Sequence, residues 1–319
     1  YQQYGPPDVL KIQEVDKPSY GEDEVLIKVR AVEVTKADIE MRSFKFSVLW
    51  FWLPLRLAFG VTKPRKQILG TYFAGEIVAR GDGVTEFEIG DEVFGTAGLA
   101  LGAYGEYVAL PASYPIARKP SNMSFVEAAA VPLGGFNALH FLTRAEIQPG
   151  ERVLINGAGG VIGAHGILIA KAMGGEVIAV DSKVKEPLIR KCGADEFIDY
   201  QEENFVDREG TYDVIFDMVS SSNTKACIDL LNPKGRYLSG NPRLMTMLRC
   251  VLTNKTSDKS ATFAFAAEDT ESLASLRQMV EDEKIISIVE HVLPMEDVRD
   301  AHNLVENEQR RGAVVIEMP

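Results

Sequence analysis

The chain has 319 residues, enough for about two domains, and its 46% hydrophobic and 25% charged content is typical of a globular protein. A formal net charge of −12 argues against a nucleic-acid partner, because such a surface needs clustered Lys and Arg. The three cysteines, Cys192, Cys227 and Cys250, have the spacing of neither a disulfide framework nor a zinc site. They fit a reducing compartment, so we expect a cytoplasmic protein.

The first 115 residues alternate short β segments with turn residues. Residues 23–34 alternate with period two, and residues 75–84 and 90–96 are strand patterns flanked by Gly and Asp. The apolar run 47–61 contains a proline and an arginine and is shorter than the ~20 residues of a membrane span. We therefore expect a loop or short helix over a pocket there, and no membrane partner.

The pattern changes near residue 119. Residues 124–145 have helical spacing, and Ser124 with Glu127 forms a possible capping box. Apolar strand runs then alternate with helices, which indicates a parallel sheet covered by helices on both faces. These runs are 152–157, 176–181, 196–200, 212–219, 235–240 and 261–266.

The C-terminal tail again resembles the first part of the chain. It contains an amphipathic helix near 273–282, a second helix over 296–308 and a closing strand over 312–318. We predict an α/β protein in which residues 1–118 and 262–319 form a β-rich domain. Residues 119–261 form a doubly wound parallel-sheet domain inserted between them.

A glycine-rich turn follows the first strand of the inserted domain. The strand is Val153–Asn156, the turn Gly157–Gly163 and the helix about Ala164–Met173. Glycines before a helix N-terminus are typical of a pyrophosphate site in a dinucleotide-binding domain. A tight turn without a ligand is the alternative. The predicted cofactor contacts in the turn are Ala158, Gly159, Gly160, Val161, Ile162 and Gly163.

The next strand ends in Asp181, 18 residues after Gly163. An acid at this place accepts from a ribose 2′-hydroxyl and favours NAD(H), whereas a 2′-phosphate favours Lys or Arg. Ser182, Lys183 and Lys185 follow directly, so the charges point both ways; the lysines can also be solvated side chains of a helix start. We predict that Tyr200 lies across the adenosine and that Arg311 reaches the same region.

Nearly the whole chain resembles the zinc-independent medium-chain dehydrogenase/reductases, in their quinone oxidoreductase-like branch. The resemblance implies a GroES-like β domain plus a Rossmann domain, and the use of NAD(P)H to reduce quinones or the C=C bond of α,β-unsaturated carbonyls. It also implies a homodimer through the edge strand of the Rossmann sheet, for which 261–266 is a candidate. The segments that carry it are residues 4–10, 31–42, 68–95, 102–110, 127–142 and 190–200 and the glycine turn.

Zinc-dependent relatives place Cys and His ligands in the β domain. Here the corresponding positions hold Thr35 and Thr71–Tyr72, and the four-cysteine structural lobe is absent. Zinc needs thiolate, imidazole or carboxylate ligands, so we expect no metal. Without a Lewis acid, the easier chemistry is hydride transfer to an acceptor that conjugation has made electron-poor.

The resemblance suggests three polar residues near the reacting atoms. They are Thr35 at the family's Asn/Thr pocket position, Tyr72 where this branch commonly has Asp, and Asn137 near the expected nicotinamide edge. A purely structural role is the alternative for each. Trp52 and Phe59 in the apolar run are predicted to roof a hydrophobic substrate pocket; packing or a dimer surface is the alternative.

The function predicted from sequence is hydride transfer from NAD(P)H to a small hydrophobic quinone or enone. The family and the two lysines favour NADP(H), whereas Asp181 favours NAD(H). The alternative is a nucleotide-binding protein with little catalysis, acting in redox sensing or as a scaffold.

Overall fold

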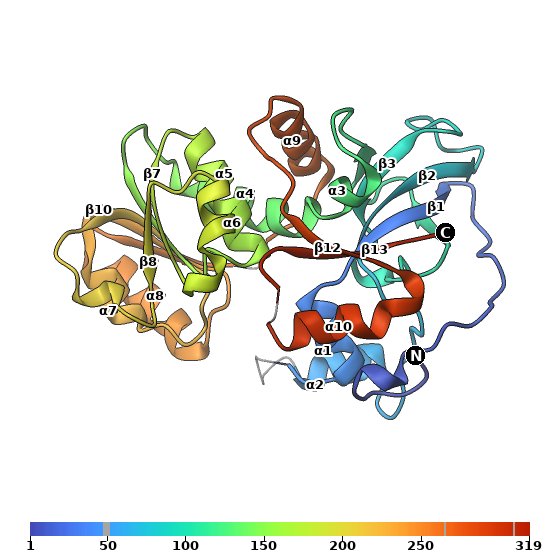
Figure 1. Cartoon of the computed structure of the whole chain (residues 1–319), viewed down its shortest axis with the longest axis horizontal. Helices are drawn as coiled ribbons and strands as arrows, with labels where there is room; N and C mark the ends of the chain where they lie inside the picture. The colour runs from blue at the N-terminus through green and yellow to red at the C-terminus, as the bar shows by residue number, and fades with distance from the viewer. Residues whose placement is uncertain (47–51, 265, 309) are drawn as a thin grey trace. The chain divides into compact units, whose positions relative to one another are not determined.

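Two compact groups of residues make up the chain in the computed structural model, which describes all residues except 47–51, 265 and 309 (Figure 1). Unit 1 contains residues 1–132, 269–277 and 289–319, and unit 2 contains residues 133–268 and 278–288. Residues 119–132 group with unit 1, because α3 (Phe125–Ala129) packs against its strands, and residues 262–268 and 278–288 group with unit 2. The domain bounds 1–118 with 262–319, and 119–261, stay predictions.

A seven-stranded sheet forms the centre of unit 1. Its order is β12-β13-β1-β2-β3-β5, and β4 also pairs with β1. Paired strands are antiparallel except β12 and β13, which run parallel. Fully buried Val25, Ile27 and Phe73 lie in its core, which confirms the β-rich fold expected of the chain ends. The strands are β1 (Glu24–Glu33), β2 (Tyr72–Arg80), β3 (Glu92–Thr96), β4 (Tyr107–Pro111), β5 (Ile116–Arg118), β12 (Val289–Pro294) and β13 (Ala313–Glu317).

Short helices complete unit 1. The predicted capping box is present, since the Ser124 hydroxyl accepts from the Glu127 N–H at 3.3 Å and starts α3. The short helix expected in the apolar run is α2, although the side chain of Trp52 lies outside the described part of the chain. The other helices are η1 (Pro7–Val9), α1 (Lys36–Ser43), α2 (Trp52–Phe59), η3 (Gly98–Ala100), η6 (Met295–Asp297) and α10 (Val298–Glu306).

Unit 2 contains a six-stranded sheet in the order β11-β10-β9-β6-β7-β8, and all its pairs are parallel. This is the doubly wound order 3-2-1-4-5-6 when the strands are counted from β6. The predicted parallel sheet is therefore confirmed. The strands are β6 (Arg152–Asn156), β7 (Glu176–Asp181), β8 (Glu196–Asp199), β9 (Tyr212–Asp217), β10 (Leu231–Ser239) and β11 (Ser260–Phe263).

The helices of unit 2 cover this sheet. Helices α5 and α6 lie together near β6 to β8, and α7 and α8 lie together near β10 and β11 (Figure 1). Across the described residues, no helix combines the length and the apolar content that crossing a membrane requires. The helices are α4 (Pro132–Ala145), α5 (Val161–Ala172), η4 (Lys183–Lys185), α6 (Glu186–Lys191), η5 (Phe205–Asp207), α7 (Thr224–Asp229) and α8 (Leu244–Thr256); α9 (Thr270–Glu281) is shared between the units.

A buried arginine joins α1 to α10 within unit 1. The fully buried Arg42 guanidinium donates to His302 Nδ1 at 3.2 Å and pairs with Glu306 at 2.5 Å. Arginine can only donate, so Nδ1 of His302 must carry the lone pair and Nε2 the proton. Nε2–H then donates to the Tyr104 hydroxyl at 3.0 Å. Burial, followed by the charge of Arg42, lowers the pKa of His302 to about 3, which agrees with this neutral tautomer.

His302 makes unit 1 sensitive to acid. Its folded pKa lies below the ordinary 6.5, so below about pH 6.5 the unfolded chain binds a proton that the folded chain does not. Stability from this residue is complete at neutral pH and is lost as the pH falls. We expect His302→Gln, which accepts from Arg42 without titrating, to remove about 2 kcal/mol of the stability lost between about pH 7.5 and 5. Denaturant unfolding at both pH values measures this, and equal losses in the two proteins would contradict it.

Candidate nucleotide-binding site

The glycine turn lies at the carboxyl end of β6. A Cβ built on Gly163 would lie 2.2 Å from the Gly157 carbonyl oxygen, so only glycine fits there. Gly157 itself has φ +83°, a conformation that other residues rarely adopt. Helix α5 begins at Val161, earlier than the predicted Ala164, because Gly160 is already its N-cap and accepts from the Ala164 N–H at 2.8 Å.

The backbone N–H groups of the turn fall into two sets. Those of Ala158, Gly159 and Gly160 are used inside the protein, by the Val180 carbonyl, the Asp181 carboxylate and the Gly157 carbonyl respectively. Those of Val161, Ile162 and Gly163 form the first turn of α5, where helix geometry provides no intrahelical acceptor. The helix N-terminus therefore fits a phosphate group through these three residues.

Asp181 at the end of β7 is folded back onto the turn. Its Oδ2 accepts from the Gly159 N–H at 2.8 Å, and its Oδ1 accepts from the Ser182 N–H at 2.8 Å. The residue is only 7% exposed. From the sequence we expect this carboxylate to accept a hydrogen bond from a ribose hydroxyl. In the structure it already accepts from two backbone N–H groups, and these bonds shape the turn.

The lysines after Asp181 are also partnered. Lys185 lies 3.7 Å from the Asp181 carboxylate, and its stem covers Gly159, where an added Cβ would come within 2.5 Å of Lys185 Cδ. Lys183 is exposed and pairs with Glu186 at 2.6 Å, a contact that raises the pKa of Lys183. Tyr200 is 56% exposed, and its N–H donates to the Asp181 carbonyl at 3.2 Å. Ser182, Lys185 and Tyr200 thus gather around Asp181.

A buried polar cluster missed in the sequence lies beside the turn, where the strand order of the sheet reverses. Asn156 at the end of β6 donates to Asp217 at the end of β9 at 3.0 Å. Asp217 also accepts from Ser222 at 2.9 Å and from the Tyr237 hydroxyl at 2.7 Å. Burial raises the pKa of Asp217, and these hydrogen bonds oppose the rise. The sequence did contain a signal for this cluster, since Asn156 and Asp217 are polar residues at the ends of two apolar strand runs.

Asn137 lies in α4 of unit 2. Its amide nitrogen donates to the Leu133 carbonyl one turn earlier at 2.9 Å, which uses one of its two N–H groups within the helix. Nearby, His165 of α5 donates through Nδ1 to the Val161 carbonyl at 2.9 Å, and burial lowers its pKa to about 4. A Cβ on Gly134 would meet that imidazole at 2.1 Å, which explains the close packing of α4 on α5.

Thr35 and Tyr72 lie at the same end of the β1–β2 ladder in unit 1, which pairs Val32 with Phe73. The Thr35 hydroxyl donates to Asp38 at 2.7 Å and accepts from the Asp38 N–H at 3.2 Å, so it caps α1. Asp38 also accepts from the Gly70 N–H at 3.1 Å, which ties the segment before Tyr72 to the cap.

Glu33 at the end of β1 is fully buried, and neither carboxylate oxygen has a hydrogen-bond partner within the described part of the chain. Burial raises its pKa well above the ordinary value, while Arg310 acts in the opposite direction. The available signal was its place in the period-two pattern, since Glu33 is in phase with the apolar residues Val29 and Ala31.

The remaining predicted contacts lie elsewhere in unit 1. Phe59 is 8% exposed and belongs to the core of the unit, where the Tyr4 hydroxyl donates to its carbonyl. Arg311 pairs with Glu290. The substrate role of Phe59 and the nucleotide contact of Arg311 stay predictions.

The positions that hold zinc ligands in zinc-dependent relatives carry hydroxyl groups in this chain. The side chains there are the hydroxyls of Thr35, Thr71 and Tyr72. Within the ranges that the structure describes, no three His, Cys, Asp or Glu residues are grouped so as to hold an ion.

Comparison with known proteins identifies the family. The profile of the alcohol dehydrogenase GroES-like domain matches residues 21–121, and the profile described as zinc-binding dehydrogenase matches residues 192–316. The 2-methylene-furan-3-one reductase of Solanum lycopersicum is 30% identical over 99% of this chain and 77% of its own length. The chain belongs to the medium-chain dehydrogenase/reductases of the quinone oxidoreductase-like branch.

Two further likenesses bear on the site. The chloroplastic NADPH-dependent alkenal/one oxidoreductase of Arabidopsis thaliana is 30% identical, with 99% of this chain and 78% of that protein covered. The solved quinone oxidoreductase from Coxiella burnetii is 28% identical with a TM-score of 0.87, and the match covers 100% of this chain and 98% of that one. The fold is therefore a GroES-like domain with a Rossmann domain.

Gly163 provides a direct test of the proposed phosphate site at the glycine turn. We expect Gly163→Ala to weaken nicotinamide nucleotide binding by about tenfold or more, because the added Cβ pushes the turn away from the first turn of α5. Gly21→Ala is the control, since its Cβ meets only the Glu24 side chain, at 3.6 Å. Nucleotide titration by calorimetry, with circular dichroism to verify folding, measures the change. Wild-type affinity in the Gly163 variant would exclude a phosphate site at the glycine turn.

Proposed function

We propose that this chain reduces quinones or α,β-unsaturated carbonyls with a nicotinamide cofactor. The observation that carries the proposal is the glycine turn, which presents the free N-terminus of α5 beside Gly163, where no side chain fits. Relatives named as quinone, alkenal/one and furanone reductases support the reaction class. The bound cofactor supplies the hydride, and the protein orients the acceptor and excludes water.

The cofactor that we propose is NADP(H). Asp181 is held by Gly159 and Ser182, so its carboxylate is turned into the protein, and Lys185 lies within 3.7 Å to offset its charge. A 2′-phosphate can then pair with Lys185. The NADPH-dependent relative supports this choice.

For the reacting end, we propose that Thr35, Tyr72 and Asn137 contact the substrate or the nicotinamide. The capping bonds of Thr35 fix its hydroxyl, which favours positioning over proton transfer. Tyr72 carries the only phenol of the three and is the candidate hydrogen-bond donor to a developing oxyanion. Asn137 offers its side-chain carbonyl and the second N–H of its amide, since α4 uses only one of the two N–H groups. Trp52 and Phe59 are proposed to contact the hydrophobic part of the substrate.

Three further features belong to this proposal. Hydride transfer proceeds without zinc, because the residues at the family's ligand positions are hydroxyls, which are poor zinc ligands. The protein is a cytoplasmic homodimer. Strand β11 is the candidate dimer contact, since it is an edge strand of the unit 2 sheet.

Turnover separates this function from the alternative of a nucleotide-binding sensor or scaffold. We expect NADPH oxidation with members of a panel of quinones and enones, followed as loss of the nicotinamide absorbance, and little change on adding a metal chelator. Tight NADPH binding without turnover on any acceptor would favour the sensor or scaffold instead.

The lysine pair allows a test of cofactor choice. We expect Lys185→Gln to weaken NADPH binding by about tenfold, the loss of one charge-assisted contact, and to change NADH binding much less. Lys183→Gln is the matched control and should have a smaller effect, because Lys183 is exposed and already paired with Glu186. Titration of both nucleotides against each variant measures this. Equal losses for NADPH and NADH would show that Lys185 supports the turn and does not recognise the 2′-phosphate.

A further inference from the structure

Residues 43–75 are basic, although the protein as a whole is acidic. They contain five Lys or Arg and no Asp or Glu, whereas about one residue in seven of the whole chain, 46 of 319, is an acid. The chain has a formal net charge of −12, so this segment has the opposite sign. A local reversal of charge favours an anionic partner. The five cations are Lys45, Arg56, Lys63, Arg65 and Lys66.

The last turn of α2 has an inner and an outer side. Phe59 lies in the core of unit 1. The Arg56 guanidinium lies over the rings of Tyr4 and Phe44, at 4.4 and 4.2 Å from the ring centroids. Leu57, in contrast, is 58% exposed. These contacts hold the helix to unit 1 and leave the side that carries Leu57 open to solvent.

The chain folds back against the end of α2. The Arg65 N–H donates to the Phe59 carbonyl at 2.8 Å, and the Arg65 guanidinium donates to the Ala58 carbonyl at 3.4 Å. Gly60 allows this return, because its φ is +124° and an added Cβ would lie 2.0 Å from the Lys63 carbonyl oxygen. The basic segment after the helix therefore lies beside the C-terminal end of α2.

Apolar and basic side chains are exposed together at this place. Val61 is 55% exposed, and the three cations that follow it are exposed as well. Exposed apolar side chains next to Lys or Arg are typical of segments that bind a membrane surface. We call this surface the α2 patch; it consists of Leu57, Ala58, Val61, Lys63, Arg65 and Lys66.

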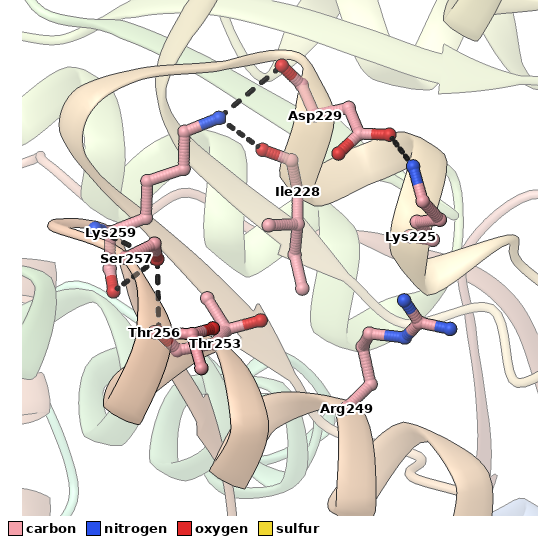
Figure 2. Close-up of a pocket in the computed structure, with 8 residues that line it drawn as sticks. All are labelled: Lys225, Ile228, Asp229, Arg249, Thr253, Thr256, Ser257 and Lys259. Carbon is pink, nitrogen blue, oxygen red and sulfur yellow. Dashed lines mark hydrogen bonds and ion pairs between the residues drawn. The ribbon is translucent and has the colours of Figure 1, made fainter.

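The cations of the α2 patch differ from other lysines of the chain. They form no ion pair with any residue that the structure describes. Beside a pocket of about 230 Å³ in unit 2, in contrast, Lys225 pairs with Asp229 (Figure 2). Lys259 at the same pocket donates to two backbone carbonyls, at 2.7 and 3.3 Å. The charge of the α2 patch is therefore available to an external anion.

We propose that the α2 patch binds the surface of an anionic phospholipid membrane. Leu57, Ala58 and Val61 contact the boundary between headgroups and acyl chains, and Lys63 and Lys66 pair with headgroup phosphates. A second copy of the chain fits less well, because it would bring the cations of both copies together with no acid in the segment to offset them. The sequence prediction of no membrane partner was based on the lack of a spanning segment, which a surface contact does not need.

The α2 patch is separate from the other surfaces proposed for this protein. It belongs to unit 1, whereas β11, the candidate dimer contact, belongs to unit 2. Trp52 and Phe59, the proposed substrate contacts of α2, are not among its residues. Membrane binding can therefore be measured independently of turnover and of the dimer.

Vesicle flotation with the whole chain tests the proposal. We expect the protein to float with vesicles of mixed phosphatidylcholine and phosphatidylserine, much less with phosphatidylcholine alone, and less at high salt. The double variant Leu57→Gln/Val61→Gln should abolish binding. Val15→Gln/Ile89→Gln is the matched control, since both side chains are 66% exposed in unit 1 and lie outside the patch.

The charges are tested separately. Lys63→Gln/Lys66→Gln should weaken binding to the mixed vesicles about 25-fold, about fivefold for each cation near the surface. Lys11→Gln/Lys17→Gln changes the net charge equally, at exposed lysines outside the patch, and should have a smaller effect. Circular dichroism verifies that the variants fold, and the lysine variant keeps the test valid if the apolar variant does not.

Three results would overturn the proposal: no flotation of the wild-type protein, equal flotation with both kinds of vesicle, or wild-type binding by the Lys63→Gln/Lys66→Gln variant. Light scattering after size-exclusion chromatography gives the competing result. If Leu57→Gln/Val61→Gln lowers the molecular mass of the assembly and the wild-type protein does not bind vesicles, the patch contacts a second copy of the chain.

Discussion

One hydrogen bond, from the Gly159 N–H to the Asp181 carboxylate, joins the turn after β6 to the end of β7. It uses the one donor of Gly159 and thereby directs the chain into Gly160, the N-cap from which α5 starts. A buried carboxylate is costly unless it is hydrogen-bonded or paired, and the Ser182 N–H and Lys185 complete its surroundings. Asp181, the last residue of β7, therefore also fixes the shape of the glycine turn.

Two other buried acids organise loops in the same way. Asp38 accepts from the N–H groups of Thr35 and Gly70, and Asp217 accepts from the Val219 N–H and from side chains of neighbouring elements. In each case burial raises the pKa of the acid, and hydrogen bonds from the backbone act against the rise. Such acids hold irregular backbone in place, so a buried acid near a candidate site need not take part in chemistry.

The sequence was sufficient for features that depend on local pattern. Strand runs, the Ser124 cap and the glycine turn were all readable, because each follows from residue type and spacing over a few positions. The partner of Asp181 lies 22 residues away and is a backbone N–H, which leaves no trace in composition. Thr35 followed three residues later by Asp38 is the pattern of a capping box, so the cap of α1 could also have been predicted from sequence. The family resemblance suggested a role for the Thr35 hydroxyl in the substrate pocket instead. Helix α2 shows a further limit, since an apolar run in the sequence does not reveal which of its side chains are exposed.

These contacts sharpen the question of cofactor choice. Asp181 with Lys185 and Lys183 with Glu186 form two pairs of opposite charge, so these four residues together contribute no formal net charge. Net charge alone therefore cannot select between a ribose hydroxyl and a 2′-phosphate. The choice between the two cofactors therefore depends on which of the two ion pairs separates when the nucleotide binds. Lys185 is held to Asp181 at 3.7 Å, longer than a hydrogen bond, and Asp181 keeps its two backbone donors if Lys185 turns away. A phosphate can thus recruit Lys185 without leaving a buried charge unpartnered, and this favours NADP(H) despite the acid at the end of β7.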